Sequence, residues 1–344
     1  MSILGRIGTA CKGLVFGDTL IPQEFTIGLE EPQTEITVWL HGMGAPHDVT
    51  RRCTTACFAP FMMAIALDEC QKLKSIKSGQ RMRLDFCEKS GKQLLGEIRL
   101  KLVTNIGLDA SQLLLFKISG STNYCMPRLR LWAHYLLQSY SYLRKAKTFE
   151  LKMTLLAQRA ATVSFIRPHP ICLVSLIGEH GGNIFPMNLM GELGKNYFGF
   201  ALKDSRRAAH LVERAGRIAI SNVPLSWAPV AFRLAVNHKK ESIDWGELPF
   251  STRKSAAFGI PVPDFAPRIR EMEIRQIHKI GSHTFFVAQL IHDEVISRVS
   301  ELYVIHGFYQ AWRLKGQRAE LKASTISDSV NKRGSDHSPL KQGT

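Results

Sequence analysis

A cluster of cationic and hydroxyl side chains lies between two patterned segments in the second half of the chain. It reads Lys203-Asp204-Ser205-Arg206-Arg207, with a strand-like segment at 197–202 before it and a helix-like segment at 206–215 that Gly216 ends. Free backbone N–H groups at the start of a helix, the positive end of its dipole, a hydroxyl and guanidinium groups together favour an anion. Alternatively, Asp204 or Ser205 simply caps the helix while the arginines face water. The cluster by itself leaves both interpretations open.

Several other catalytic signatures are missing. The sequence has no G-x-G-x-x-G, no H-E-x-x-H, and no P-loop, since the stretch at 191–196 lacks the terminal Ser or Thr. Trp39-Leu40-His41-Gly42-Met43-Gly44 resembles an oxyanion loop, but no G-x-S-x-G follows it, so a tight glycine turn after a strand is favoured. Rossmann dehydrogenases, P-loop NTPases, zinc proteases and serine hydrolases are all disfavoured.

The elements that must position the cluster are short strands. Strand patterns and glycine turns, with one or two intervening helices, predict a small closed barrel rather than a doubly wound sheet. The predicted strands are 171–177, 183–189, 197–202, 217–222, 270–280 and 284–292, with a further helix at 228–236.

The first 150 residues have a different pattern. Residues 80–87 and 94–103 alternate with period two around a turn and predict a hairpin, to which 113–118 adds a strand. Residues 61–74 and 129–147 are typical of helices. We therefore expect a small α+β unit, whose role the sequence does not indicate.

Four segments of the second half, in this order, resemble the flavin reductase-like family. They are Arg167-Pro168-His169-Pro170 with the apolar run after it, Gly181-Gly182-Asn183-Ile184-Phe185-Pro186-Met187-Asn188, Lys203-Asp204-Ser205-Arg206, and Gly281-Ser282-His283-Thr284. The resemblance covers about 163–294 and implies an FMN-binding split β-barrel, commonly a homodimer with flavin near the subunit interface. The sequence departs from the family pattern after Met190, where 191–196 replace a Pro-Pro step.

The resemblance also implies roles for individual residues. The flavin ring or ribityl chain would lie along Asn183, Pro186, Met187 and Asn188. The phosphate would be held by Lys203, Ser205 and Arg206, with Leu202 beside them. His283 would sit beside the ring as the catalytic residue, although a turn histidine bonded to a backbone carbonyl is an equal alternative. The cofactor would be FMN or FAD, with NADH or NADPH as electron donor.

Composition sets the remaining limits. The 344 residues include 45 Lys and Arg against 29 Asp and Glu, a net charge of +16, and apolar residues make up 45%. The basic residues are spread along the chain, so a solvated surface is favoured over nucleic-acid binding. Seven cysteines in no disulfide pattern, and no leader-like or spanning segment, predict a reduced, cytoplasmic protein with no membrane contact. Cys53 and Cys57, with His41 and His47 upstream, are better explained as buried thiols than as a metal site.

The sequence thus predicts an α+β domain at 1–150, a flavin reductase-like split barrel at 151–312, and a disordered basic tail at 313–344. The predicted activity is NAD(P)H-dependent flavin reduction by hydride transfer to flavin N5, in a homodimer that passes electrons to a partner such as a monooxygenase. Two alternatives remain. One is a flavin-binding protein without reductase activity, serving as a redox sensor or electron-transfer partner, and the other is a basic nucleic-acid-binding protein.

Overall fold

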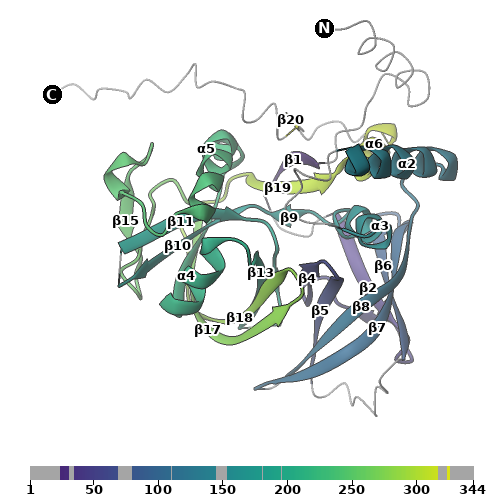
Figure 1. The fold of residues 1–344 in the computed structure, drawn as a ribbon, viewed down its shortest axis with the longest axis horizontal. Coiled ribbons are helices and arrows are strands. Elements are labelled where there is room, and N and C mark those ends of the chain that lie inside the picture. The colour runs from purple at the N-terminus through teal and green to yellow at the C-terminus, as the bar shows by residue number, and fades with distance from the viewer. Residues whose placement is uncertain are drawn as a thin grey trace, which may run out of the picture.

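The structure is a computed structural model of the 344-residue chain. It describes residues 24–30, 35–68, 80–109, 111–144, 153–179, 181–194, 196–316 and 324–325. Within them, two curled antiparallel sheets stand side by side, with helices on their outer flanks (Figure 1). The predicted tail lies outside the described residues, apart from 313–316 and 324–325.

The C-terminal sheet is the predicted split barrel. Its seven strands run in the order β11-β10-β14-β17-β18-β13-β12. Each predicted strand of the second half is present, within a few residues at either end. The strands are β10 (Cys172–Gly178), β11 (Gly181–Met187), β12 (Met190–Glu192), β13 (Tyr197–Lys203), β14 (Arg217–Asn222), β17 (Arg268–Ile280) and β18 (His283–Val295).

The N-terminal sheet also has seven strands, in the order β3-β2-β6-β7-β8-β5-β4. The predicted hairpin and third strand are confirmed as β6, β7 and β8, and β2 ends in the expected turn, where Gly42 has φ +110°. The strands are β2 (Ile36–His41), β3 (His47–Asp48), β4 (Cys53–Phe58), β5 (Phe61–Asp68), β6 (Arg81–Glu88), β7 (Leu94–Leu108) and β8 (Ser111–Asn123).

The two sheets have the same topology. If the strands of each sheet are numbered from one to seven along the chain, both sheets have the strand order 2-1-5-6-7-4-3. Their long hairpins also share irregularities: the β7–β8 register shifts at Arg99/Leu100 and Leu102/Thr104, and the β17–β18 register at Glu271/Met272 and Ile274/Gln276. In both hairpins the second shift follows the first by three residues, so the chain contains one architecture twice, although its sequence shows no repeat.

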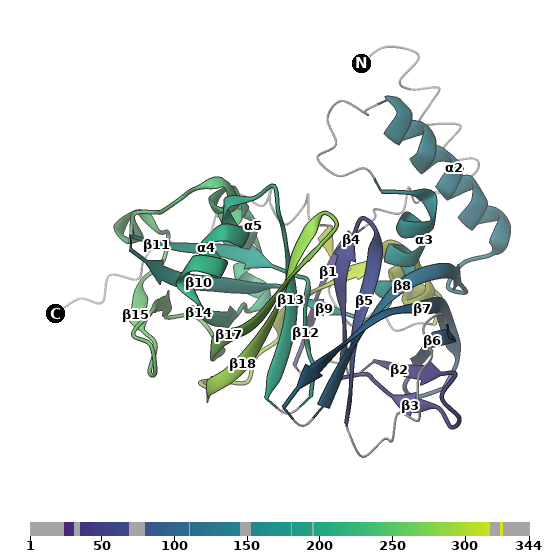
Figure 2. The same cartoon turned by 60° about the horizontal axis from the view of Figure 1, so that its bottom comes forward.

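The two sheets pack against each other through a shared apolar core. Strands β4, β5 and β8 bury Cys57, Ala64 and Leu113 against Ile184 and Phe285 of the C-terminal sheet. Each sheet has a second core on its other face, so the molecule is a half-barrel, a shared core and a half-barrel (Figure 2).

Two glycines permit this close approach. A Cβ on Gly191 of β12 would lie 2.9 Å from the carbonyl oxygen of Cys53, and one on Gly281 would overlap Ala59 and Pro60. The Ser282 amide, beside Gly281, donates to the Ala59 carbonyl at 2.9 Å. A side chain at either glycine would therefore push the sheets apart.

A third sheet brings together a strand from the N-terminal part of the chain and strands from its C-terminal part. Its order is β20-β1-β19-β9, and β1 pairs with β19 along its whole length. These strands are β1 (Glu24–Leu29), β9 (His169–Pro170), β19 (Glu301–His306) and β20 (Ser324–Thr325), and a separate two-stranded sheet holds β15 (Thr252–Lys254) and β16 (Pro261–Pro263).

Helices cover the outer faces. Helix α2 (Arg128–Arg144) matches the helix expected at 129–147, and α4 (Arg207–Ala215) the one expected at 206–215. The helix expected at 228–236 is split into α5 (Ala228–Arg233) and a 3-10 turn, η2 (Leu234–Lys239). The remaining helices and 3-10 turns are α3 (Leu155–Ser164), α6 (Gly307–Lys315), η1 (Leu225–Trp227) and η3 (Trp245–Glu247).

One element was predicted wrongly. Residues 61–74 were expected to be helical, but Phe61–Asp68 forms β5, between β4 and β8, and 69–74 lie outside the described residues. Phe61, Met63, Ile65 and Leu67 pack into one core, whereas Met62, Ala64 and Ala66 pack into the other. A strand buried on both faces has no polar alternation, so its Met, Ala and Leu residues read as helix formers.

The five cysteines among the described residues are free thiols. Cys53, Cys57, Cys125 and Cys172 are buried and unpaired, and Cys87 is half-buried. Among the residues that the structure describes, no group of three or more His, Cys, Asp or Glu is placed to hold a metal ion, and no helix is long and apolar enough to cross a membrane.

Candidate functional site

The anion cluster lies where β13 passes into α4. Phe198, Phe200 and Leu202 pack into the barrel core and hold β13 in place. The strand ends at Lys203, where the chain turns. The N-cap position of α4 is Arg206, in an extended conformation (φ −104°, ψ 139°), and no side chain caps the helix. The Arg206 amide donates to the Lys203 carbonyl at 3.0 Å and the Ala209 amide to the Arg206 carbonyl at 3.3 Å. The N–H groups of Arg207 and Ala208 therefore remain available to a ligand or to water.

Asp204 and Ser205 do not cap this helix. The Asp204 carboxylate accepts a hydrogen bond from the Thr284 hydroxyl, and the Asp204 amide donates to the Ser282 carbonyl at 3.2 Å. Asp204 thus ties the turn to β18, and Ser205 is exposed at its tip. The structure removes the capping interpretation and keeps the anion-binding one.

An open hollow of about 760 Å³ surrounds this turn. Its cationic lining consists of Arg206, Arg207 and Lys239, with His210 beside them. Two carboxylates, Asp204 and Glu241, also line it, and Asp204 is bonded to Thr284. Glu241 accepts hydrogen bonds from Arg207 and Arg214, which hold the pKa of Glu241 below its ordinary value. The hollow is therefore positively charged and open to solvent, as a phosphate group requires.

His238 connects this hollow to the predicted ring side. Its Nε2 donates to the carbonyl of Pro186 at 2.7 Å, and its ring centroid lies 4.8 Å from that of Phe185. Burial lowers the pKa of His238, and the positive charges of Arg206 and Lys203 lower it further. The imidazole is thus neutral near pH 7 and stands between the cationic turn and β11.

The sequence pattern around His238 did not indicate this position. His238 belongs to the short basic stretch His238-Lys239-Lys240, a pattern typical of a solvated surface. Only the path of η2 across β11 brings it to Pro186. A histidine whose partner is a backbone carbonyl far along the chain leaves no sequence signal.

The four predicted ring-side residues separate into two groups. Asn183 is completely buried, and its Nδ2 donates to the carbonyls of Asn237 (3.1 Å) and Lys240 (3.0 Å), so it fixes η2 onto β11. Met187 is buried in the barrel core. Pro186 and Asn188 are only half-buried and remain reachable by a ligand.

His283 lies at the contact between the two sheets. It is 1% exposed, and its Nδ1 is 2.8 Å from Ser282 Oγ and 3.6 Å from Cys57 Sγ of the N-terminal sheet. The Phe58 ring meets it edge-on at 5.7 Å. Burial, followed by the charge of Lys203, lowers the pKa of His283 to about 4, so the ring is neutral at pH 7.

The structure therefore brings Lys203, Ser205 and Arg206 to one turn. It places His283 opposite Lys203 in the β13–β18 register, and neither residue is among those that line the hollow, whereas Ser205 and Arg206 are. Leu202, Asn183 and Met187 are buried supports.

A flavin fits this arrangement at its phosphate end, where uncapped helix amides, a hydroxyl and cations converge. On the ring side the fit rests on Pro186, Asn188 and His238, because Asn183, Met187 and His283 are shielded by their neighbours.

No family model and no curated protein matches the chain. Among solved structures, it is similar to an FMN-binding protein from Thermus thermophilus with bound p-hydroxybenzaldehyde (TM-score 0.33, 22% identity, 37% of this chain and 72% of that one). It is also similar to the NADH:FAD oxidoreductase SgcE6 of Streptomyces globisporus (0.39, 16%, 47% and 95%). A third is the styrene monooxygenase flavin reductase of Pseudomonas putida S12 (0.36, 19%, 43% and 93%).

Proposed function

We propose that residues 151–312 bind FMN or FAD by its phosphate at the start of α4, and that the protein reduces this flavin with NADH or NADPH. The observation that carries the proposal is the uncapped N-terminus of α4, which opens into a hollow lined by Arg206, Arg207 and Lys239 beside the exposed Ser205 hydroxyl. Backbone amides, a hydroxyl and cations around one turn match the acceptor-rich phosphate of a nucleotide.

When bound, the flavin supplies a ring that accepts hydride at N5. The chain's own part is to hold and orient it. The α4 turn fixes the phosphate, and Asp204, bonded to Thr284, keeps that turn against β18. His238, held by the Pro186 carbonyl, offers a neutral polar edge between phosphate and ring. Such a reaction requires close positioning of two rings more than it requires an acid or a base.

A second copy of the chain is not needed for the sheet-to-sheet contact. The resemblance implies a homodimer with flavin near the subunit interface, whereas here two sheets of one topology meet within one chain. The homodimer, the cytoplasmic location and the electron-accepting partner such as a monooxygenase stay as parts of the proposal.

A flavin-binding protein without reductase activity is the second candidate. The observation favouring it is the burial of His283, the residue expected beside the nicotinamide, at 1% exposure. The two candidates differ only in whether nicotinamide reduces the flavin.

The test is an absorbance spectrum of the purified protein from 300 to 550 nm, taken after reconstitution with FMN or FAD. It is then repeated anaerobically after addition of NADH and then NADPH. Flavin bands that bleach with either nucleotide support the reductase. Bands that persist support the second candidate, and the absence of bands after reconstitution contradicts both.

A further inference from the structure

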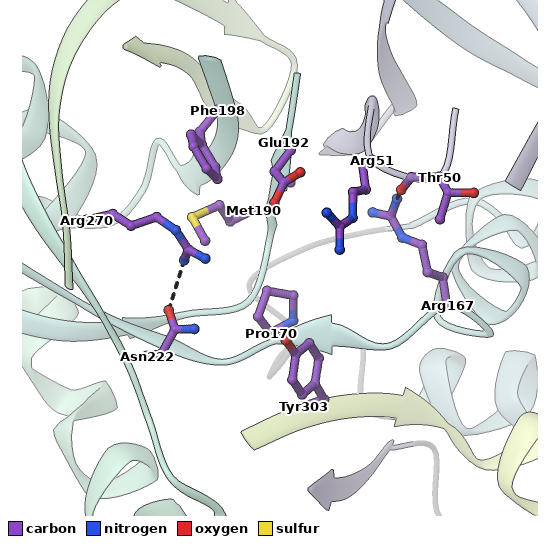
Figure 3. A pocket seen from close by; sticks show the side chains of 11 residues that line it. Thr50, Arg51, Arg167, Pro170, Met190, Glu192, Phe198, Asn222, Arg270 and Tyr303 are labelled. Atoms are coloured by element: carbon purple, nitrogen blue, oxygen red, sulfur yellow. Dashed lines mark hydrogen bonds between the residues drawn. The ribbon is translucent and has the colours of Figure 1, made fainter. Parts of the chain in front are cut away.

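A second, smaller cavity lies where the two seven-stranded sheets meet the four-stranded sheet. Its walls come from the segment before β4, from β9 and β19, and from four strands of the C-terminal sheet (Figure 3). The cavity volume is about 50 Å³. At roughly 10–15 Å³ for each water by this measure, it holds a few water molecules or one small organic ion.

Three arginines and one carboxylate line this cavity. Arg51 comes from the turn before β4, Arg167 from the segment before β9, and Arg270 from β17, whereas the carboxylate is Glu192 of β12. Figure 3 shows the guanidinium groups of Arg51 and Arg167 on one side of the cavity and that of Arg270 on the other. The lining thus carries an excess of positive charge.

Arg270 is a buried arginine with an unpartnered donor. It is 5% exposed, its Nη1 donates to Asn222 Oδ1 at 3.0 Å, and its guanidinium lies over Phe198, 5.5 Å from the ring centroid. Its Nε has no hydrogen-bond acceptor, and the Asp293 carboxylate is 3.9 Å away. A buried guanidinium with an unused donor is costly unless an acceptor reaches it.

The opposite wall combines a buried, hydrogen-bonded arginine, Arg167, with an exposed one, Arg51. Arg167 is buried, and its Nη1 donates to the Thr50 carbonyl (3.0 Å) and to Cys53 Sγ (3.1 Å). Arg51 is exposed at the mouth and makes no hydrogen bond or ion pair with any residue that the structure describes. A ligand entering at the mouth would meet Arg51 first.

Other acidic groups near the cavity are already engaged. Glu301 accepts from Asn222 Nδ2 at 2.6 Å, and Asp293 accepts from Arg268 Nε at 2.7 Å. Glu192 is the carboxylate that lines the cavity itself, and it opposes an anion.

We propose that this cavity binds a small monocarboxylate. A planar carboxylate matches the planar guanidinium groups, and its short apolar part would lie against Met190 and Phe198. The size of the cavity admits an ion no larger than about acetate.

The monocarboxylate site is separate from the flavin site. Phe198, near the beginning of β13, lines the cavity, and Lys203 ends the same strand beside the hollow. Five residues of extended chain put roughly 17 Å between them. The proposal therefore does not depend on flavin binding, and either can fail alone.

The probe is sodium acetate, titrated against the purified full chain at constant ionic strength with sodium chloride as balance. The readouts are the midpoint of thermal unfolding and the heat of binding by calorimetry. We expect a saturable rise in the midpoint. Arg51→Gln should weaken acetate binding by at least tenfold, and Glu192→Gln should tighten it.

The matched control is Arg298→Gln, the same loss of charge at an exposed arginine outside the cavity. It should leave acetate binding unchanged. No saturable effect of acetate beyond that of chloride would overturn the proposal. An equal loss in Arg51→Gln and Arg298→Gln, or weaker binding in Glu192→Gln, would also overturn it.

Discussion

The two seven-stranded sheets share strand order and bulge spacing, yet their basic hollows are built from different elements. Each has a basic hollow: about 760 Å³ beside α4 in the C-terminal sheet, and about 640 Å³ lined by Arg81, Arg83, Arg99, Lys101 and Ser119 in the N-terminal one. Only the first includes the start of a described helix, because the strands β6 to β8 supply most of the second.

Under the proposed function, positive charge alone does not make a phosphate site on this scaffold. In the C-terminal hollow, the N-terminus of α4 has no side-chain cap, and the positive end of its dipole favours an anion there. In the N-terminal hollow, the residues lie on paired strands, whose backbone amides take part in the hydrogen bonds of the sheet. The pairing of β6 with β7 from Arg81↔Lys101 to Leu84↔Ile98 is an example. The same architecture supports different chemistry through its connections.

The largest effect should come from the helix start. Ser205→Ala combined with Arg206→Ala removes a hydroxyl and a cation from the hollow, and flavin binding should weaken by about 2–4 kcal/mol. Fluorescence titration with FMN measures it. The matched control is Ser119→Ala with Arg99→Ala in the N-terminal hollow, which should leave the dissociation constant unchanged. Equal losses in the two variants would break the comparison.

The buried His283 should make the sheet contact sensitive to acid. Its pKa is about 4 in the fold, against 6.5 ordinarily, so the unfolded chain binds the extra proton between these values. The free energy of unfolding should therefore fall as pH falls from about 6.5 to 4, by up to about 3 kcal/mol from this group.

Urea unfolding at several pH values measures that slope. His283→Gln should flatten it, whereas His210→Gln, at an exposed helix position of the hollow, should not. His169 and His306, whose pKa values burial also lowers to about 3, keep part of the slope in both variants. An unchanged slope in His283→Gln would show that the sheet contact does not depend on this neutral ring.

Two glycines with similar positive φ angles can isolate the packing of one sheet on the other. Gly281 (φ +55°) meets Ala59 and Pro60, whereas Gly216 (φ +66°) has nothing within 4 Å of an added Cβ. Both Gly→Ala substitutions carry a conformational cost, but Gly281→Ala should cost about 1–3 kcal/mol more because of the overlap. Equal urea midpoints for the two variants would contradict the close contact.

The smallest effect concerns the carboxylate in the C-terminal hollow. Glu241→Gln removes the partner of Arg207 and Arg214, so FMN should bind slightly more tightly at low salt. The gain should disappear as salt is raised. Weaker binding in this variant would indicate that Glu241 orients Arg207 toward the ligand.

The sequence predicted the C-terminal sheet well because most of its strands are apolar runs bounded by glycine turns. It did not predict that the N-terminal half repeats the same topology, since topology constrains alternation and turn positions more than residue identity. Strand β5 shows the limit: its seven apolar residues from Phe61 to Leu67 face two cores, and no periodicity remains to separate strand from helix.

For the candidate site, local order along the chain was enough to predict the turn from β13 to α4. It was not enough for His238 or for the burial of His283, because both depend on segments packed from elsewhere: η2 across β11, and β4 against β18. Asn183 illustrates the same limit, because its side-chain nitrogen donates to the backbone carbonyls of Asn237 and Lys240 and is not available to a ligand.

Because the two half-barrels belong to one chain, their contact is formed by an intramolecular encounter. Its effective concentration is set by the connecting segment and does not change when the protein is diluted. A contact between separate subunits would instead weaken by mass action as protein concentration fell. The pairing of β1 with β19 adds a second tether from the far end of the chain. The sheet contact should therefore persist at nanomolar protein and release only when the chain unfolds.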